Sequence, residues 1–215
     1  IVSEVTLAIG AVALGAGLVC GIAGGFFARI VLAGVAWIPP AVRVQTRHPV
    51  VFAGACGLGV AVIGVASGGA TFGGGYEATR AILDGSFAAP WYYTAGRYAS
   101  SLLTALAGIP AGIFAPSLAI GAGIGHDLAP FAPEGVAAAA VVALCMAAFL
   151  AAVTDAPLTS FVVVMEMIDG HALVLSLMVA TVTARLVARL ITPPLYEPIA
   201  ARLRHVRDAK RAVAR

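Results

Sequence analysis

The chain has 215 residues, of which 61% are hydrophobic and 11% charged, and its mean hydropathy is +1.01. A soluble domain of ordinary composition carries roughly 25% charged and about 45–50% apolar residues. The composition therefore excludes an ordinary soluble protein, and the apolar excess also excludes intrinsic disorder. The 25 glycines and 12 prolines are too many for simple helical rods, but membrane helices tolerate them. The sequence predicts an all-α, polytopic membrane protein.

The net charge of +3 is concentrated at one end of the chain. Residues 202–215 contain six basic side chains and one acid, whereas the rest carries a slight negative excess. The positive-inside rule places this tail in the cytoplasm, where we interpret it as a topology anchor beside anionic headgroups. A nucleic-acid partner is not expected, because the rest of the chain belongs in lipid. We therefore divide the chain into a transmembrane domain, 1–201, and a basic cytoplasmic tail, 202–215.

Apolar segments alternate with short breaks along the chain. Residues 5–38 are expected to form one long tilted helix, whose glycines allow close contacts between helices. Because the chain begins without Met and inside an apolar segment, we expect it to be the C-terminal part of a longer protein. Further helices are expected over 49–66, 76–83, 91–107, 117–128, 134–153, 157–167 and 171–191, with a last one starting at Leu195.

Several of these helices are shorter than the roughly 20 residues that a hydrocarbon core requires. Short segments interrupted by Gly or Pro are typical of discontinuous helices in channels and transporters. Irregular backbone at membrane depth persists only where it is buried in protein or lines a watery cavity. A site is therefore expected at the breaks, which are residues 67–75, 108–116 and 193–196.

The break at 108–116 has the chemistry of a weak anion site. Pro116 is compatible with the first turn of a helix, so the backbone N–H groups of Ile113 and Phe114 lie at a helix start without intrahelical acceptors. The helix dipole adds positive potential there, and Gly112 allows close approach to the backbone. The segment contains no Lys or Arg that would hold an anion too tightly for conduction. The alternative is a kinked junction that binds nothing.

Tyr196 follows the break at Pro193-Pro194. Its hydroxyl is a neutral donor that could complete the coordination of an anion. The alternative is an interfacial tyrosine beside the cytoplasmic tail.

Four segments carry a resemblance to a known family. The segment GIPAGIFAPSLAIGAGIG resembles the second anion-binding signature, G-x-P-G-G-x-F-x-P, of the CLC chloride channels and proton/chloride antiporters. The segments SGGATFGGG, TDAPLTSFVVVMEMID and PPLYEPIAARL resemble three further family motifs in the same order. The family's Gly-Gly pair is Ala111-Gly112 here.

The resemblance implies the second half of a CLC-type inverted-repeat fold with tilted and broken helices. It implies a homodimer, which we place at residues 157–191, with Val163 and Leu177 facing the twin. It also implies that the N–H groups of Ile113 and Phe114 and the hydroxyl of Tyr196 contact the anion. The loop residues that shape this site would be Gly108, Pro110, Gly112 and Pro116.

The implied function is chloride transport across a membrane, with chloride as substrate, no cofactor and the first half of the same subunit as a partner. Channel and antiporter remain alternatives, because the family's first-half motifs, which carry the gating glutamate, have no match here. A proton is a second substrate only in the antiporter. The competing functions are a non-transporting half-CLC membrane scaffold and an unrelated secondary transporter of organic anions.

The remaining polar residues receive structural interpretations. Asp155 is read as a helix cap, and Glu166, by resemblance, as a structural acid near the subunit interface. The pair His126-Asp127 is read as loop polarity, with a pH sensor as its alternative. Arg185 and Arg189 share a helix face and are expected to snorkel to the interface or to attract anions. Cys20, Cys56 and Cys145 are far apart and indicate free thiols rather than a metal site. No constellation indicates an enzyme.

Overall fold

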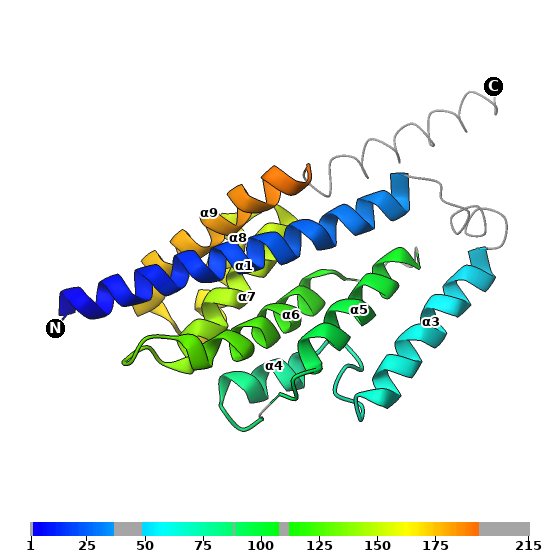
Figure 1. Cartoon of the computed structure of the whole chain (residues 1–215), viewed down its shortest axis with the longest axis horizontal. Coiled ribbons are helices and arrows are strands. Elements are labelled where there is room, and N and C mark those ends of the chain that lie inside the picture. Colours follow the sequence, from blue (N-terminus) through cyan, green and yellow to red (C-terminus); the bar gives the residue numbers. More distant parts are fainter. Residues whose placement is uncertain (1, 37–48, 88, 108–111, 194–215) are drawn as a thin grey trace.

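The computed structural model describes residues 2–36, 49–87, 89–107 and 112–193 (Figure 1). Every regular element in these ranges is helical. The longer helices are α1 (Val2–Ala36), α3 (Pro49–Ala66), α5 (Tyr93–Leu106), α6 (Phe114–Leu128), α7 (Ala138–Thr154) and α9 (Val174–Ile191). The shorter elements are α4 (Tyr76–Leu83), α8 (Pro157–Ile168) and the 3-10 turns η1 (Ala129–Phe131) and η2 (His171–Leu173).

These elements confirm the all-helical prediction and most of its boundaries. The bounds of α3 and α4 agree with the expected 49–66 and 76–83, because proline or glycine stands at the start of each. α1 is one continuous helix, as expected. Five starts differ by two to four residues. α1 and α6 each begin three residues earlier than expected, whereas α5, α7 and α9 begin at Tyr93, Ala138 and Val174 rather than at residues 91, 134 and 171.

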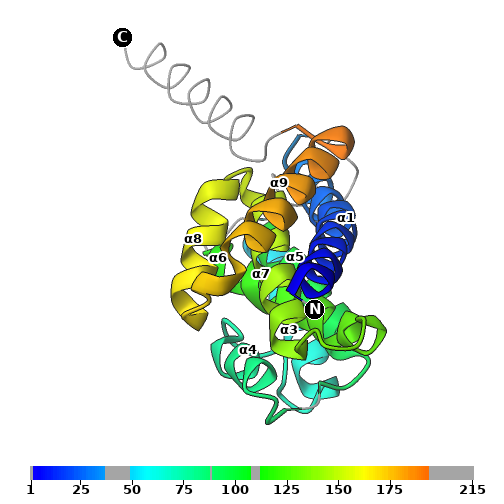
Figure 2. The same ribbon diagram turned by 90° about the vertical axis from the view of Figure 1, so that its left-hand side faces the viewer.

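The centre of the structure is α7. Every residue from Val141 to Val153 is buried, and the helix packs against α1, α6, α8 and α9. Figure 2, which looks along the bundle, shows α7 surrounded by these helices. Because the helix is covered on all sides, its sequence is apolar all round rather than amphipathic.

α1 and α9 approach each other through a row of small residues. The glycines of this row are spaced four apart on α1 and face alanines with the same spacing on α9. A methyl group added to Gly21 would lie only 2.8 Å from the carbonyl oxygen of Ala184, so the contact requires glycine there. This confirms, for these glycines, the expectation that the glycines of the first segment allow close helix contacts, whereas a methyl group added at Gly10 or Gly15 would meet no neighbour within 4 Å. The row consists of Gly17, Gly21 and Gly25 with Ala180, Ala184 and Ala188.

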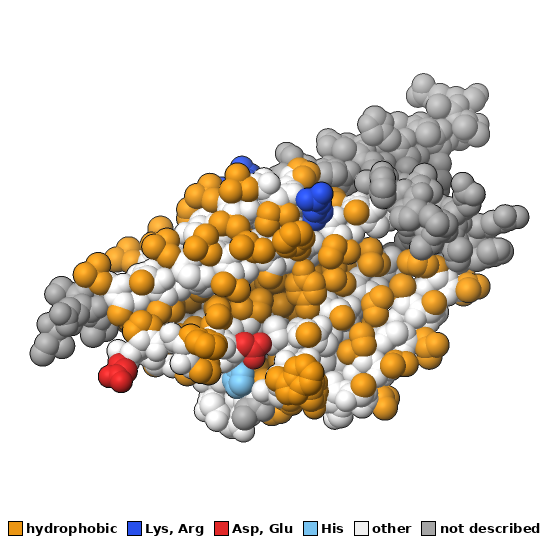
Figure 3. Space-filling view, viewed as in Figure 1, with side chains coloured by type: hydrophobic (Ala, Val, Ile, Leu, Met, Phe, Trp, Pro, Cys, Tyr) orange, Lys and Arg blue, Asp and Glu red, His pale blue; other side chains and the backbone are white. Residues whose placement is uncertain are grey.

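The outer surface is largely apolar. Two segments, Leu7–Gly34 and His171–Ile191, are long and apolar enough to cross a membrane, and only 33% and 28% of their most apolar stretches are buried. Figure 3 shows hydrophobic side chains distributed widely over the described part of one face, including α1 and α3. A water-soluble protein rarely exposes so large an apolar surface. These two helices therefore differ from the core helices of a soluble protein, which are mostly buried.

Candidate functional site

The first part of the site is the start of α6. Ile113 is the N-cap residue, and its carbonyl oxygen accepts hydrogen bonds from the backbone N–H and the hydroxyl of Ser117, at 3.1 and 2.7 Å. Phe114 is the first helical residue, and Pro116 lies in the first turn, as predicted. Because Ser117 donates the first intrahelical bond, the N–H groups of Ile113 and Phe114 lie ahead of the hydrogen-bond ladder. The helix therefore presents two donors and the positive end of its dipole at this point.

A cavity of about 410 Å³ adjoins the start of α6. It brings together two of the three breaks, because Gly73 and Gly74 line one side and Gly112 and Ile113 another. Hydroxyl-bearing residues of α5 and a few apolar residues complete its wall: Ser100, Ser101, Thr104, Phe27, Ala105, Ala115 and Pro116.

The glycine-rich break, residues 67–75, is stabilised by a hydrogen bond between two of its own side chains. The hydroxyls of Ser67 and Thr71 share a hydrogen bond of 2.9 Å. Gly75, at the start of α4, has a φ of 82°, a left-handed conformation that strongly favours glycine. The break therefore turns tightly enough to bring the carbonyls of Thr71 and Phe72 against α5.

Arg97 of α5 makes that contact and was missed by the sequence analysis. Its side chain is 2% exposed, and its Nη1 donates to the carbonyl oxygens of Thr71, at 2.8 Å, and Phe72, at 3.4 Å. Arg97 also lines the cavity beside α6. The segment 108–116 itself contains no Lys or Arg, but folding brings Arg97 of α5 to the same cavity as Gly112, Ile113 and Pro116. The signal that could have found it is an ionisable residue within an apolar segment.

Of the third break, residues 193–196, the structure describes only Pro193. Tyr196 lies outside the described residues, as do Gly108 and Pro110 of the anion loop. Of the loop residues singled out from the sequence, the structure places Gly112, Ile113, Phe114 and Pro116 at the start of α6. Gly112, Ile113 and Pro116 line the cavity.

Asp155 does not cap α8, and this prediction was wrong. The residue before Pro157 at the start of α8 is Ala156, and no side chain caps that helix. Asp155 instead follows α7 in a left-handed conformation with a φ of 58°, and its carboxylate accepts hydrogen bonds from Arg185 and Arg189 at 2.7 to 2.9 Å. These donors hold the pKa of the Asp155 carboxyl below its ordinary value, with the Arg189 hydrogen bond as the largest cause. The two arginines thus pair with an acid rather than only snorkelling.

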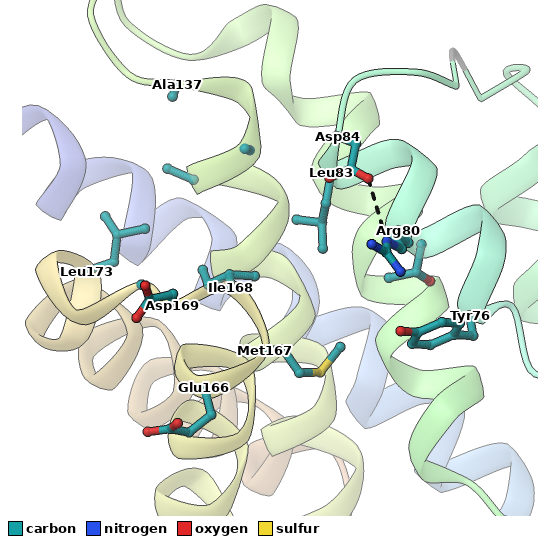
Figure 4. Close-up of a pocket in the computed structure, with 14 residues that line it drawn as sticks. Tyr76, Arg80, Leu83, Asp84, Ala137, Glu166, Met167, Ile168, Asp169 and Leu173 are labelled. Carbon is teal, nitrogen blue, oxygen red and sulfur yellow. Dashed lines mark ion pairs between the residues drawn. The ribbon is translucent and has the colours of Figure 1, made fainter.

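Glu166 lies away from the start of α6. It is exposed on α8 and lines a larger cavity, of about 820 Å³, between α4, α7 and α8. Figure 4 shows Glu166 and Met167 on the α8 side of this cavity and Tyr76 and Arg80 on the α4 side, with Arg80 paired to Asp84. Glu166 is not among the described residues that line the cavity beside α6.

The remaining sequence-based assignments have mixed outcomes. Asp127 accepts a hydrogen bond of 2.7 Å from Thr94 of α5, so the His126-Asp127 pair belongs to the last turn of α6 and not to a free loop. Leu177 is fully buried inside the chain, so its assignment to a face toward a twin was wrong. The three cysteines are buried free thiols, as predicted.

The helices and breaks together define an all-helical protein with the discontinuous helices of channels and transporters. The family model described as "Voltage gated chloride channel" matches residues 2–189, and the chain belongs to this family. The resemblance seen in the four sequence segments is thereby confirmed. Membership makes the chain part of an integral membrane protein.

Two curated relatives show how much of a family member the chain represents. The H(+)/Cl(-) exchange transporter ClcA of Yersinia pestis bv. Antiqua (strain Angola) is 34% identical over 167 residues, which cover 74% of this chain and 34% of the relative. The protein of the same name from Salmonella agona (strain SL483) is 34% identical over 148 residues, covering 65% of this chain and 31% of the relative. The chain thus spans about a third of the length of these relatives.

Proposed function

We propose that this chain carries part of the chloride pathway of a CLC-type transport protein. In this proposal the backbone N–H groups of Ile113 and Phe114 bind a dehydrated chloride at the start of α6, and the hydroxyl of Tyr196 closes the inner end of the site. The observation that carries the proposal is the start of α6, where both N–H groups precede the first intrahelical hydrogen bond.

The proposed ligands of the chloride are neutral hydrogen-bond donors. Hydrogen bonds from backbone N–H groups to an anion are charge-assisted and about twice as strong as neutral ones, and the helix dipole adds to them. A few such bonds can compensate for part of the hydration that chloride loses when it enters the site. Family membership and the printed names of the relatives, which are proton/chloride exchangers, support chloride as the substrate and leave proton coupling to be measured.

Family membership also suggests the topology and the oligomeric state of the complete protein. We infer that residues 1–201 form the second half of an inverted-repeat transmembrane subunit, that the first half supplies the remaining ligands, and that residues 202–215 lie in the cytoplasm. We also infer a homodimer through 157–191. A row of apolar side chains on α9 that are exposed in the described structure supports this interface, and it consists of Leu175, Met178, Val179, Val182, Leu186 and Leu190.

The test uses the complete gene product. Anomalous scattering from crystals in which bromide replaces chloride locates the anion. Calorimetry on the protein in lipid nanodiscs measures chloride affinity. Tyr196→Phe removes one donor to an anion, which is worth about 1.5–3 kcal/mol, so affinity should fall by about tenfold to a hundredfold. Tyr76→Phe, on exposed Tyr76 of α4, is the matched control and should leave affinity unchanged.

Three results would contradict the proposal in different ways. Bromide absent from the start of α6, together with chloride binding indifferent to Tyr196→Phe, would remove the site. Binding without flux in proteoliposomes would favour the membrane scaffold. Flux of small carboxylates that chloride does not compete for would favour an organic-anion transporter.

A further inference from the structure

We propose that Asp155 is a positioning residue of the chloride site, which fixes the end of α9 relative to α7 through Arg185 and Arg189. It thereby sets the point at which the segment that contains Tyr196 leaves α9. The inference rests on the proposed chloride function, in which Tyr196 is a ligand. It adds to that site a residue that does not itself contact the anion.

The proposed ligands follow or begin two helices that make little direct contact. Ile113 and Phe114 stand at the start of α6, whereas Tyr196 follows α9. In the described part of the chain α6 and α9 share at most a marginal contact, but both pack against α7. α6 lies close against α7, since a methyl group added to Gly121 would be only 2.6 Å from the Cα of Met146. The position of α9 on α7 therefore decides how the two sets of ligands lie relative to each other.

Asp155 is the polar link between α7 and the end of α9. It is the C-cap residue of α7, and its carboxylate accepts one hydrogen bond from Arg185 and two from Arg189, at 2.7 to 2.9 Å. The side chain of Asp155 is only 20% exposed. Hydrogen bonds between ionised groups are about twice as strong as neutral ones, and the paired bonds of an arginine also fix an orientation. The link therefore fixes α9 in rotation as well as in position.

The backbone of Asp155 also indicates a role for its carboxylate. A residue that ends a helix in the left-handed conformation, here with a φ of 58°, is usually glycine. Asp169, which ends α8 with a φ of 49°, is the other non-glycine residue of this kind among the described residues. Its side chain is 92% exposed and lies 3.2 Å from His171. Asp169 thus matches Asp155 in residue type and conformation, but it stands at the opposite end of α8.

The chain between α9 and Tyr196 is short. Thr192 is buried in an extended conformation, with a φ of −151°, and its N–H donates to the carbonyl oxygen of Ala188 at 3.0 Å. Tyr196 is four residues further on, and four residues span at most about 14 Å. The position of Thr192 therefore limits where the Tyr196 hydroxyl can lie. Because a hydrogen bond tolerates little change in distance or angle, a small shift of the end of α9 weakens the contact of this hydroxyl with chloride.

The experiment is a double-mutant cycle on the complete gene product in lipid nanodiscs, with chloride affinity measured by calorimetry. Asp155→Asn should weaken chloride binding by about threefold or more in the otherwise wild-type protein, as for residues coupled in one network. It should have no further effect in a protein that already carries Tyr196→Phe. A merely structural role of Asp155 would not depend on the Tyr196 hydroxyl. Asp169→Asn is the matched control and should leave chloride affinity unchanged in both backgrounds.

A second variant separates positioning from folding. Asp155→Gly also removes the carboxylate, but glycine adopts the left-handed conformation without strain. Its unfolding temperature should therefore be at least that of Asp155→Asn. The loss of chloride affinity should be as large as in Asp155→Asn, because both variants release the end of α9. Chloride affinity restored to the wild-type value in Asp155→Gly would overturn the inference.

The outcomes separate this inference from the chloride proposal. If Tyr196→Phe weakens chloride binding and Asp155→Asn does not, this inference alone is overturned. An equal loss from Asp155→Asn in both backgrounds would also overturn it, because the effect would not pass through Tyr196. Chloride binding indifferent to Tyr196→Phe would remove Tyr196 from the proposed site and overturn this inference with it.

Discussion

Arg189 of α9 donates from Nε and Nη2 to both carboxylate oxygens of Asp155, at 2.8 and 2.7 Å. Arg185, one turn earlier, adds a third bond of 2.9 Å to the same carboxylate. Asp155 stands in the turn between α7 and α8. The cluster therefore ties this turn to the last part of α9, directly before the segment that contains Tyr196.

The Asp155 cluster predicts a pH-dependent stability. The arginines lower the pKa of the Asp155 carboxyl, so its stabilising contribution is present above the unfolded-state pKa of about 4 and disappears as the pH falls through the folded-state pKa. Asparagine tolerates the left-handed backbone of this position. Asp155→Asn should therefore remove only the charge, and it should lower the free energy of unfolding by about 1–2 kcal/mol at neutral pH. Thermal unfolding in detergent between pH 3 and 7 measures the difference between the two proteins.

The matched control for this cluster is Asp84, whose carboxylate lies 3.8 Å from Arg80 on the exposed face of α4. An exposed pair of this kind contributes little, so Asp84→Asn should change the unfolding temperature only slightly. A constant gap between wild type and Asp155→Asn across the whole pH range would show that the carboxylate charge is not the cause.

The glycine row of α1 predicts a steric effect on stability. An added methyl group at Gly21 meets the backbone of Ala184, so Gly21→Ala should push α1 from α9 and cost about 1–3 kcal/mol. Gly15→Ala is the control, because a methyl group there meets nothing within 4 Å. It should be neutral or slightly stabilising, since alanine favours a helix over glycine by up to about 1 kcal/mol. Unfolding temperatures of both variants in detergent decide the matter.

The exposed row on α9 predicts the position of a dimer contact. Leu186→Trp and Leu190→Trp place bulky rings on this row and should convert dimers of the complete protein into monomers. Val62→Trp, at an exposed site on α3, should leave the dimer intact. Single-molecule photobleaching in liposomes counts the subunits. Dimers that survive both α9 substitutions would place the interface on another face.

The basic tail predicts an orientation in the membrane. A cysteine introduced by Arg211→Cys should resist a membrane-impermeant maleimide added to intact cells and should react after permeabilisation. Cys20, Cys56 and Cys145 are buried and should add little to the signal, and the protein without Arg211→Cys gives the background. Reaction before permeabilisation would reverse the orientation.

The sequence predicted the elements that proline and glycine delimit, but it placed some of them imprecisely. The bounds of α3 follow from Pro49 at its start and a glycine-rich break at its end. Pro116 indicated a first helical turn near Ile113 and Phe114, but the helical run was placed only from residue 117, because Ile113 and Phe114 are apolar and give no capping signal. Helix boundaries set by tertiary packing leave no such local mark.

The part of the site that the sequence did not predict depends on contacts between distant residues. Arg97 meets Thr71 across 26 positions, and Asp155 meets Arg189 across 34. Helical periodicity cannot tell which face of an almost wholly apolar segment meets which neighbour. The proposed donors, the N–H groups of Ile113 and Phe114, could be predicted because they are neighbours in the chain, whereas Arg97 reaches the same cavity from another helix.

The glycine row on α1 also has a consequence for biosynthesis. α1 is made early in this chain, but its partner row on α9 is synthesised about 160 residues later. At a translation rate of about 5–20 residues per second, α1 waits roughly 8 to 30 seconds before the alanines of α9 exist. During that interval its glycine face can meet only lipid, the translocon or helices other than α9. Premature partners at this face would therefore be a direct route to misassembly, and the late synthesis of α9 sets the earliest moment at which this bundle can close.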